Sequence, residues 1–499
     1  MKTNPEKQRF DLCVLGCGPA GFAAAMRALD AGKDACIIEG GEIGGTGVMW
    51  GALASKTMWE LAKDYSVAAK VDRGYRASGL TADYRAVRNS VLQAVKEKQY
   101  QMLSQIETFS PRRWSGKGSI SYIRGWGAFR SADTVEVRLV DGGTETVSAD
   151  FFLIATGSRP RDFPGIETDG VRVLTSDHVL NLTEFPRRLM IIGAGIIGCE
   201  YSAIFSNFGQ TKVYLADHAE RVIPYEDDDI SDFVSTHLRA NGVTIFQTAN
   251  LQQIVKRPDH LEVVLDFADG RSEVVEVDTV LISIGRTPNI ETLNLEGIGV
   301  TPNENGVLQT DENCHVTRNV YACGDVTHHP NLVNLAEMEG RYAVKHMYGF
   351  ARHCLNYDNM STVMFFRPAV AAVGLNEKGC RRRNIAYRVA SYGNALVSRA
   401  IAMRATDGFS KIIVSNDEEQ RLLGMRAAGP MASNNIMTIA LLMDHAPNLA
   451  DALKTVHPHP TMSEGIQECL RVLLEKSVFK ETAFPDLVKV RSWKPEEDG

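Results

Sequence analysis

Apolar and polar residues along the first forty positions follow the order of a strand, a helix and a second strand. Asp11–Leu15 is a short apolar run, an alanine-rich segment continues to about Ala31, and the apolar run Ala35–Ile38 follows. The same order returns at Arg188–Ile192 and Lys212–Ala216, with a helical segment between them. Buried strands of a parallel sheet are near-continuous apolar runs, so both regions predict a strand-helix-strand unit.

Outside these two units the pattern changes. Helices are predicted at Thr57–Lys70 and Thr81–Glu107. Apolar residues alternate with polar ones over Ser119–Val147, which predicts antiparallel strands. After about Met360, strands are expected at Val363–Ala372, Ala386–Tyr392, Phe409–Ser415 and Arg421–Gly429, and helices at Met431–His445 and Thr461–Lys476. The pattern predicts an α/β chain with two Rossmann-like dinucleotide-binding domains and a C-terminal α+β domain.

Size and composition restrict the class of protein. The 499 residues suggest about three domains at ~100–200 residues each. The net charge of −7, with both signs mixed along the chain, provides no basic surface for nucleic acid. The longest apolar runs, such as Leu189–Ile197 and Ile436–Met443, are shorter than the ~18 residues of a membrane span. The N-terminal residues lack the apolar core of a signal peptide, so we expect a cytoplasmic protein.

The cysteines do not form a recognisable framework. There are nine, none of them in a C-x-x-C motif, and most stand in apolar or glycine-rich surroundings. We expect buried free thiols in a reducing compartment, rather than disulfides, and no metal site.

Both strand-helix-strand units contain a glycine fingerprint with an acid after the second strand. The first unit supplies Gly16, Gly18, Gly21 and Glu39, and the second supplies Gly193, Gly195, Gly198 and Asp217. The glycines permit a tight turn and let the backbone approach a pyrophosphate at the helix N-terminus, and the acid binds a ribose. Two dinucleotides are therefore predicted. An acid at position 217 favours NAD over NADP, while the nearby Arg221 keeps NADP as the less favoured alternative.

The stretch from Gly44 to Lys56 carries a further motif. Gly44-Gly45-Thr46, followed by Gly51, Ser55 and Lys56, resembles the redox-active segment of the flavoprotein disulfide reductases. Further similar segments, in the same order as in that group, are Ala155-Thr156-Gly157, Ile284–Asn289, Val316–Asp325 and the His-Pro-Thr-x-Ser-Glu element at 459–464. From residue 10 to 476 the chain resembles the class I pyridine nucleotide-disulfide oxidoreductases, which include dihydrolipoamide dehydrogenase, glutathione reductase and soluble pyridine nucleotide transhydrogenase.

The resemblance implies a domain order, cofactors and an assembly. An FAD-binding domain would comprise residues 1–158 and 289–358, with an NAD(P)-binding domain at 159–288 between its two parts. A dimerisation domain at 359–476 would precede a tail, 477–499, that has no assigned role. The cofactors would be FAD and NAD(H), with NADP(H) less favoured. The chain would form a homodimer whose active site is shared between subunits.

Several residues acquire a role only through this resemblance. Asp325 would hydrogen-bond the ribityl chain of FAD, and the helix that begins near Asn334 would direct its N-terminal end at the flavin pyrimidine ring. Beyond the two fingerprints, the implied cofactor contacts are Gly45, Thr46, Lys56, Thr156, Gly157, Gly285, Gly324 and Asp325.

Four residues are implied in catalysis. His459 would transfer protons at the partner subunit's flavin with Glu464 as its orienting acid, since a histidine titrates near neutral pH and needs a partner to fix its tautomer. The alternative is that His459 only packs in the dimer interface. Lys56 and Glu200 match an ion pair beside the flavin, where a lysine stabilises negative charge. A purely structural salt bridge between the nucleotide domains is an equal alternative.

The redox disulfide of the family has no counterpart in this chain. Gly47 and Ala52 stand where the family has its two cysteines, so neither position can carry a thiolate. Smaller residues there would open space over the flavin, which Met49 and Trp50 would line or fill. Cys17, Cys199 and Cys323 lie in other motifs, and nothing in the sequence brings two thiols to one ring face.

Three functions follow as hypotheses. The first is an FAD enzyme that passes hydride from NADH through flavin directly to a small diffusible acceptor such as a quinone. The second is nicotinamide transhydrogenation, which the transhydrogenase-like segment Gly195–Phe205 supports and Asp217 opposes, or oxidation of a thiol substrate at the flavin. The third is a catalytically retired flavin-binding dimer with a sensing or scaffold role.

Overall fold

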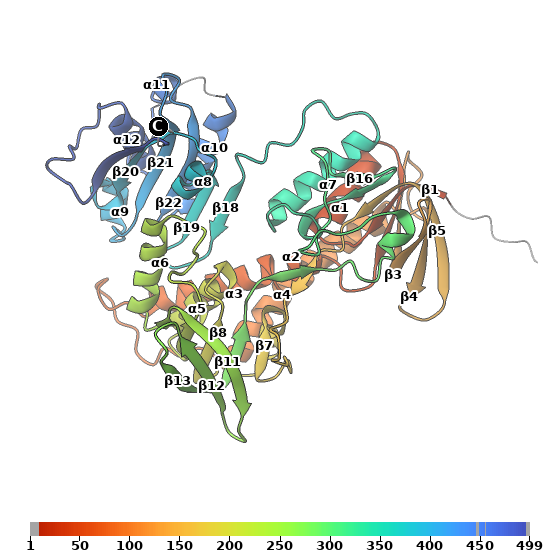
Figure 1. The fold of residues 1–499 in the computed structure, drawn as a ribbon, viewed down its shortest axis with the longest axis horizontal. Helices are drawn as coiled ribbons and strands as arrows, with labels where there is room; N and C mark the ends of the chain where they lie inside the picture. The colour runs from red at the N-terminus through yellow and green to blue at the C-terminus, as the bar shows by residue number, and fades with distance from the viewer. Residues whose placement is uncertain (1–8, 446–448, 455, 496–499) are drawn as a thin grey trace, which may run out of the picture. The chain divides into compact units, whose positions relative to one another are not determined.

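The computed structural model describes residues 9–445, 449–454 and 456–495. Residues 1–8 of the predicted FAD-binding domain and 496–499 of the predicted tail therefore lie outside the described residues. The chain divides into two compact units, each assembled from separate segments. Unit 1 contains residues 1–61, 83–184 and 284–355, and unit 2 contains residues 62–82, 185–283 and 356–499 (Figure 1).

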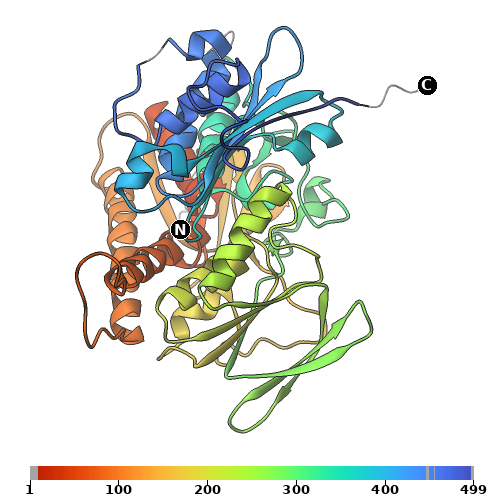
Figure 2. The ribbon, with the colours of Figure 1, turned by 90° about the vertical axis from the view of Figure 1, so that its left-hand side faces the viewer.

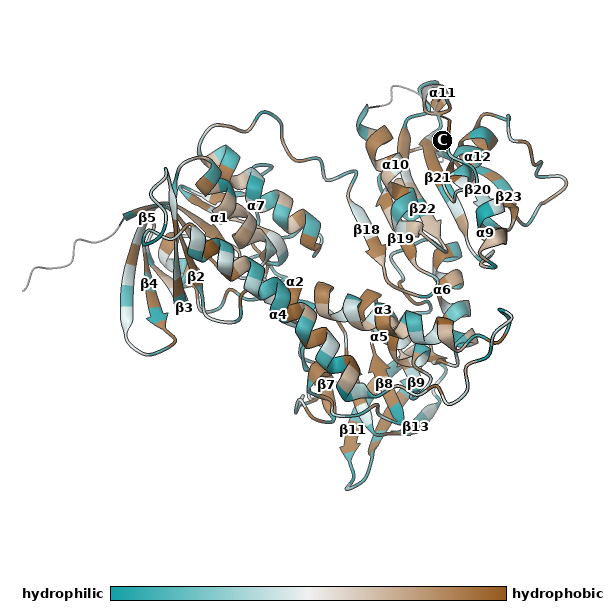
Figure 3. Ribbon diagram, turned by 180° about the vertical axis from the view of Figure 1, so that it is seen from behind, coloured by the Kyte–Doolittle hydropathy of each residue, from teal (hydrophilic) through white to brown (hydrophobic). Residues whose placement is uncertain are grey.

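Unit 1 is built on a mixed sheet in which parallel strands lie in the order β3-β2-β1-β5-β17. Strand β4 pairs antiparallel with β3 and β5, and β16 pairs antiparallel with β17. The bounds are β1 Arg9–Leu15, β2 Asp34–Glu39, β3 Ser119–Ser131, β4 Thr134–Leu139, β5 Thr144–Ile154, β16 His315–Thr317 and β17 Val320–Ala322. In Figure 3 strand β2 is largely brown, as expected for a strand with both faces covered.

The helices of unit 1 place the predicted motifs at the end of this sheet. Helix α1 follows β1 directly and packs along α7. Helix α3 begins at Ala52, earlier than predicted, and its C-terminal turns belong to unit 2. The helices are α1 Pro19–Asp30, α2 Gly45–Met49, α3 Ala52–Ala68, α4 Tyr84–Thr108 and α7 Val333–Met347. Short elements are β6 Ser158–Pro160, β7 Val173–Thr175, β15 Arg286–Pro288 and the 3-10 turns Ser176–Asn181, Leu295–Ile298 and Gly324–Val326.

Unit 2 contains the second strand-helix-strand unit. Parallel strands lie in the order β10-β9-β8-β14, and helix α5 follows β8. The antiparallel strands β11-β12-β13 form a separate ribbon, shown in green in Figure 2. The bounds are β8 Arg188–Ile192, α5 Ile196–Asn207, β9 Lys212–Ala216, α6 Asp228–Ala240, β10 Thr244–Phe246, β11 Ala249–Lys256, β12 Leu261–Phe267, β13 Ser272–Val277 and β14 Thr279–Ile282.

The C-terminal part of unit 2 is an antiparallel sheet in the order β18-β19-β22-β21-β20-β23, covered by α10 and α12. Its elements are β18 Ser361–Met364, β19 Val370–Gly374, α8 Glu377–Arg382, β20 Tyr387–Gly393, a 3-10 turn at Asn394–Leu396, α9 Ser398–Ala402, β21 Phe409–Ser415, β22 Leu422–Ala428, α10 Ala432–His445, α11 Leu449–Ala452, α12 Glu464–Leu473 and β23 Val488–Trp493. This matches the predicted α+β domain.

Three details of this sheet differ from the sequence prediction. The expected strand Val363–Ala372 is two strands, because Pro368 lies in the turn between them and cannot donate to a ladder. The expected helix Thr461–Lys476 begins only at Glu464, whose carboxylate accepts from the Thr461 N–H. The tail, for which no role was predicted, supplies β23, which pairs with β20 along its length.

A buried cluster of charges joins α6 to the C-terminal sheet within unit 2. Lys411 on β21 is fully buried, and its Nζ lies 2.8 Å from Asp227, 2.6 Å from Asp229 and 3.2 Å from Glu377. Burial alone would lower the pKa of Lys411, but the three carboxylates raise it above its ordinary value. The Arg491 Nε of β23 donates to Glu377 at 3.0 Å, so the tail completes the cluster. A buried lysine is tolerated here because it is fully paired.

The described residues contain neither a membrane-spanning helix nor a cluster of metal ligands. In the part of the chain that the structure describes, no helix is long and apolar enough to cross a membrane. Within the same residues, no group of three or more His, Cys, Asp or Glu side chains could hold a metal ion.

Candidate functional site

The first glycine fingerprint forms the turn from β1 into α1. Gly16 has φ +103°, and a β-carbon there would lie 2.3 Å from the Ala155 carbonyl oxygen. A β-carbon on Gly21 would lie 2.0 Å from the Gly16 carbonyl oxygen. Gly18, the N-cap of α1, has open space on its β-carbon side. The turn thus excludes side chains on its inner side and exposes the helix N-terminus to a ligand, as a pyrophosphate site requires.

Glu39 lies at the end of β2, beside this turn. Its carboxylate accepts from the Cys17 N–H at 2.6 Å and from the Gly41 N–H at 2.7 Å. Hydrogen bonds to a charged group stabilise by about 1.5–3 kcal/mol, so these two bonds fix the carboxylate firmly. Glu39 is therefore pre-oriented where the predicted ribose contact belongs.

Asp325 belongs to a polar cluster that joins four separate motifs. Its carboxylate accepts from the Ser158 hydroxyl at 2.6 Å, and the Arg286 Nε lies 3.8 Å away. The same Arg286 donates to the Ser158 hydroxyl at 2.7 Å and to the Thr46 hydroxyl at 3.0 Å. Arg286 also lies 3.9 Å from Asp177. Burial raises the pKa of Asp177, and the positive charge of Arg286 opposes this rise. The sequence prediction missed Ser158, Arg286 and Asp177, although the first two lie inside predicted motifs.

The remaining predicted FAD contacts stand on turns around this cluster. Gly157, Gly285 and Gly324 have positive φ, at +67°, +117° and +73°. The Thr156 hydroxyl donates to the Asn289 carbonyl at 2.6 Å, so this residue ties the two crossing segments together. A β-carbon on Gly45 would lie 3.3 Å from the Cα of Gly18. The structure therefore brings the first fingerprint and the Gly44–Lys56 stretch side by side in unit 1.

The second fingerprint repeats the first in unit 2. Gly193 has φ +102°, Gly195 is the N-cap of α5, and a β-carbon on Gly198 would lie 1.9 Å from the Gly193 carbonyl oxygen. Asp217, at the end of β9, accepts from the Ala194 N–H at 2.5 Å and from the Ala219 N–H at 2.8 Å. The acid is held here in the same manner as Glu39.

Arg221, the residue that kept NADP as an alternative, is paired with carboxylates. It forms an ion pair with Asp232, and its Nε lies 3.7 Å from Asp228 at the start of α6. These acids compete with a 2′-phosphate for the guanidinium. The arrangement fits the prediction of NAD over NADP.

Gly47, where the resemblance places one of the missing cysteines, is closely packed. A β-carbon on it would lie 2.6 Å from the Pro19 Cγ and 3.4 Å from the Val333 Cγ2. The expectation that a smaller residue leaves free space is therefore wrong at this position, because the Pro19 ring occupies it. The nearby Met49 is held by Gln99, whose side-chain amide lies 3.0 Å from the sulfur.

Lys56 and Glu200 lie in different units. Lys56 is on α3 in unit 1, and Glu200 is on α5 in unit 2, where its buried carboxylate accepts from the Phe365 N–H at 2.9 Å. Their pairing beside a flavin stays a prediction.

His459 and Glu464 lie together, as the sequence predicted. The His459 Nδ1 is 2.7 Å from the Glu464 Oε1, and the Thr461 N–H donates to the other carboxylate oxygen at 2.9 Å. Partial burial opposes ionisation of Glu464, but these two hydrogen bonds lower its pKa below the ordinary value. The imidazole is 67% exposed, so an anionic acid holds one ring nitrogen while the other faces outward.

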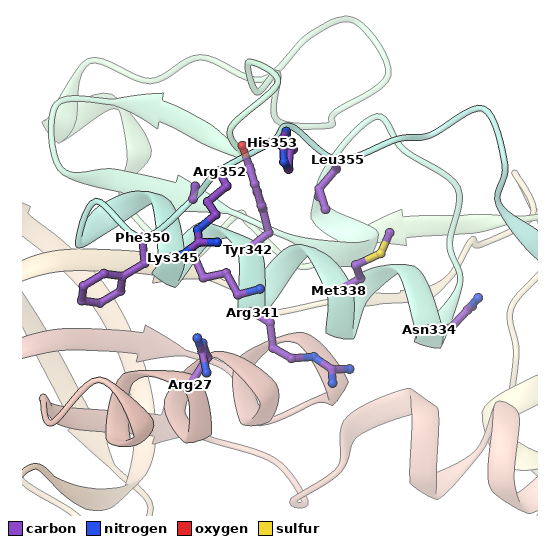
Figure 4. A pocket seen from close by; sticks show the side chains of 11 residues that line it. Arg27, Asn334, Met338, Arg341, Tyr342, Lys345, Phe350, Arg352, His353 and Leu355 are labelled. Atoms are coloured by element: carbon purple, nitrogen blue, oxygen red, sulfur yellow. The ribbon is translucent and has the colours of Figure 1, made fainter. Parts of the chain in front are cut away.

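A cavity of about 970 Å³ runs along α7 in unit 1 (Figure 4). Arg27 of α1, Arg341 and Lys345 of α7 and Arg352 of the following loop supply positive charge, and no carboxylate is among the lining residues. Arg27 pairs with Asp30 and Arg341 with Glu337, whereas no described residue forms an ion pair with Lys345 or Arg352. The apolar and aromatic part of the lining is Met338, Tyr342, Phe350 and Leu355.

The first turn of α7 reaches this cavity, because Asn334 lines it. Val333, which a β-carbon on Gly47 would meet, is not among the lining residues, and neither is any residue of the Gly44–Lys56 stretch. The cavity is therefore cationic and partly apolar, and it is lined by α1, α7 and the following loop. Sequence reasoning missed it, because Arg27 of α1 is distant in the chain from Arg341, Lys345 and Arg352.

The described cysteines offer no reactive pair. Burial raises the pKa of Cys17, and the Glu39 charge adds to this rise; burial likewise raises the pKa of Cys199. Cys323 is fully buried, and burial raises its pKa too. Cys354 is the exposed thiol among the described residues. Thiols that stay protonated are poor nucleophiles, as expected of structural cysteines.

The chain matches known proteins over most of its length. Residues 10–340 match the family model described as pyridine nucleotide-disulphide oxidoreductase, and residues 360–470 match the dimerisation domain of that family. Dihydrolipoyl dehydrogenase of Chlamydia muridarum is 30% identical over 92% of this chain and 95% of its own length. The mitochondrial dihydrolipoyl dehydrogenase of Schizosaccharomyces pombe is 31% identical over 92% of this chain and 89% of its own.

Solved structures agree with this. LpdA from Mycobacterium tuberculosis has a TM-score of 0.84 at 25% identity, over 93% of this chain and 99% of its own. The HOCl-induced flavoprotein disulfide reductase RclA from Escherichia coli, in its Cu(II) complex, has a TM-score of 0.81 at 26% identity, over 93% and 100%. The predicted family, fold class and cofactors, FAD and NAD(H), are confirmed. The chain belongs to the pyridine nucleotide-disulphide oxidoreductase family.

Proposed function

We propose that the protein is an NADH:acceptor oxidoreductase that delivers electrons from its flavin directly to a diffusible acceptor, without a redox disulfide. Gly47 carries the proposal, since the resemblance places a family cysteine at this position, where the glycine is closely packed against Pro19. When bound, FAD accepts a hydride from NADH and passes two electrons on. The residues of the chain bind both cofactors, hold the acceptor and supply a proton.

The two nucleotide sites fit their cofactors on several observations. Gly18 has open space at the N-terminus of α1, and Glu39 is oriented by two backbone donors. Asp325 with Ser158 and Arg286 forms a polar cluster beside the same turn. Asp217, which the Ala194 N–H holds in place, favours NADH over NADPH. An acid at this position accepts a hydrogen bond from the ribose 2′-hydroxyl and repels a 2′-phosphate.

His459 is the proposed proton donor. Glu464 accepts from one ring nitrogen, which leaves the other free to deliver a proton to a reduced acceptor. In the homodimer implied by the dimerisation domain, His459 of each subunit would serve the flavin of the other. The resemblance gives Lys56 and Glu200 the role of stabilising negative charge near that flavin.

The cavity along α7 supports an acceptor with an anionic group. Its positive charges outnumber the carboxylates paired with them. Its apolar side chains suit a ring system. An anionic quinone combines both properties.

The test is steady-state turnover of the FAD-loaded dimer under anaerobic conditions with NADH and a series of quinones, neutral and sulfonated. We expect turnover, with a lower KM for the sulfonated members. His459→Gln should slow acceptor reduction by about 100-fold while flavin reduction by NADH is unchanged. His457→Gln, two residues away, serves as the control. Absence of turnover with every acceptor would refute the proposal.

A second candidate is direct oxidation of a dithiol such as dihydrolipoamide at the flavin. The names of the similar proteins favour it, since several are dihydrolipoyl dehydrogenases. It predicts NAD-dependent oxidation of the dithiol without any thiol of the chain becoming reactive to alkylation. Equal flavin reduction by NADH and NADPH would instead favour transhydrogenation, and failure of both nucleotides would favour the retired dimer.

A further inference from the structure

Two aromatic side chains of β3 stand beside Glu39, outside every motif of the family. Tyr122 pairs in register with Ile37 of β2, and Trp126 lies four residues further along β3, on the same face. The first fingerprint explains the acid and the glycines of this region, but neither aromatic residue.

The Tyr122 hydroxyl is buried and has no hydrogen-bond partner among the described residues. Burial raises the pKa of Tyr122. Its register partner Ile37 lies on β2 two residues before Glu39, so this side chain stands next to the strand that ends at the acid. A buried hydroxyl without a partner is costly, so such a group indicates a partner that binds.

Trp126 covers the residue after the ribose-binding acid. A β-carbon on Gly40 would lie 2.4 Å from the indole Nε1, so the ring lies directly against the Gly40 backbone. The indole is nevertheless 45% exposed, and the Arg138 guanidinium lies 5.1 Å from its ring centre. An exposed, positioned indole at the end of β2 is available to a purine base, because the adenine extends from the ribose that Glu39 binds.

We propose that Tyr122 and Trp126 hold the adenosine half of FAD, the tyrosine through a hydrogen bond in the ribose region and the tryptophan by contact with the adenine. This assignment is independent of the acceptor, because it concerns cofactor affinity alone. It adds two residues of β3 to the FAD site.

The test uses the full-length chain stripped of FAD, with binding measured by flavin fluorescence and by displacement with ADP. Trp126→Ala should reduce the affinity for both FAD and ADP by about 10-fold, and Trp126→Phe should retain most of that affinity. Tyr122→Phe should reduce the affinity for FAD and for ADP by about 5-fold. FMN, which lacks the adenosine half, should bind wild type and variants alike.

Matched controls separate this from loss of folding. Trp114→Ala removes another partly exposed indole of unit 1, and Tyr348→Phe removes another buried hydroxyl without a described partner, beside Asp11 and Asp150. Both controls should bind FAD and ADP as wild type does. The proposal is overturned if Trp126→Ala and Tyr122→Phe bind within twofold of wild type, or if the controls lose as much affinity.

Discussion

The two glycine fingerprints have the same backbone but different surroundings. In each, an inner glycine lies against the carbonyl oxygen of the first glycine, and an acid accepts from two backbone donors. Next to Glu39, the Trp126 ring of β3 lies against Gly40. Next to Asp217, the exposed side chain of His218 places its Nδ1 3.2 Å from the carboxylate of Asp217. The comparison teaches that the same glycine turn and backbone-held acid occur in two different side-chain environments.

The largest effect should come from adding a β-carbon to the inner glycine of each turn. Gly21→Ala should yield protein without FAD, since the new carbon meets the Gly16 carbonyl oxygen at 2.0 Å. Gly198→Ala, with a contact of 1.9 Å, should retain FAD but slow flavin reduction by NADH about 10- to 100-fold. Absorbance of the purified proteins and stopped-flow reduction measure both. Cys199→Ala on the same helix is the control, and loss of FAD from Gly198→Ala would contradict the assignment.

A smaller effect is expected from neutralising each acid. Asp217→Asn should reduce the preference for NADH over NADPH about 10-fold, because the repulsion of a 2′-phosphate is lost. Glu39→Gln should leave the preference for NADH over NADPH unchanged and should instead reduce the affinity for FAD. The ratio of flavin reduction rates with the two nucleotides is the measurement. A change in that ratio for Glu39→Gln would break the separation between the two sites.

Arg221→Ala should change the rates with NADH and NADPH by less than about twofold, since its guanidinium is paired with Asp232 and Asp228. Stopped-flow reduction with each nucleotide gives the answer. A selective loss of the NADPH rate would show that Arg221 leaves these carboxylates to bind a phosphate.

The smallest difference concerns the cysteine in each fingerprint. Iodoacetamide near pH 8 should label the exposed Cys354 and leave Cys17 and Cys199 unmodified, because burial raises the pKa of both. Mass spectrometry of peptides measures the labelling. Rapid labelling of Cys17 in the FAD-loaded protein would mean that the first turn opens more readily than the packing suggests.

The sequence predicted the parts of the site that lie in continuous motifs. Glu39 and Asp217 follow directly from strand, glycine turn and spacing, and His459 with Glu464 follows from one short element. It could not predict Arg286 as the centre of a polar cluster, because the partners of this residue come from distant segments. The packing of Pro19 against Gly47 was missed for the same reason: a β-carbon contact depends on the path of the backbone, which residue types alone do not determine.

Strand β23 has a consequence for biosynthesis. Its residues are synthesised well after those of β20, yet they cover the edge of β20 and bring Arg491 to Glu377. Until then β20 is an open edge, which can pair with a neighbouring nascent chain. The C-terminal sheet therefore lacks an edge strand until β23 has been synthesised, whereas the first fingerprint is complete within the first forty residues.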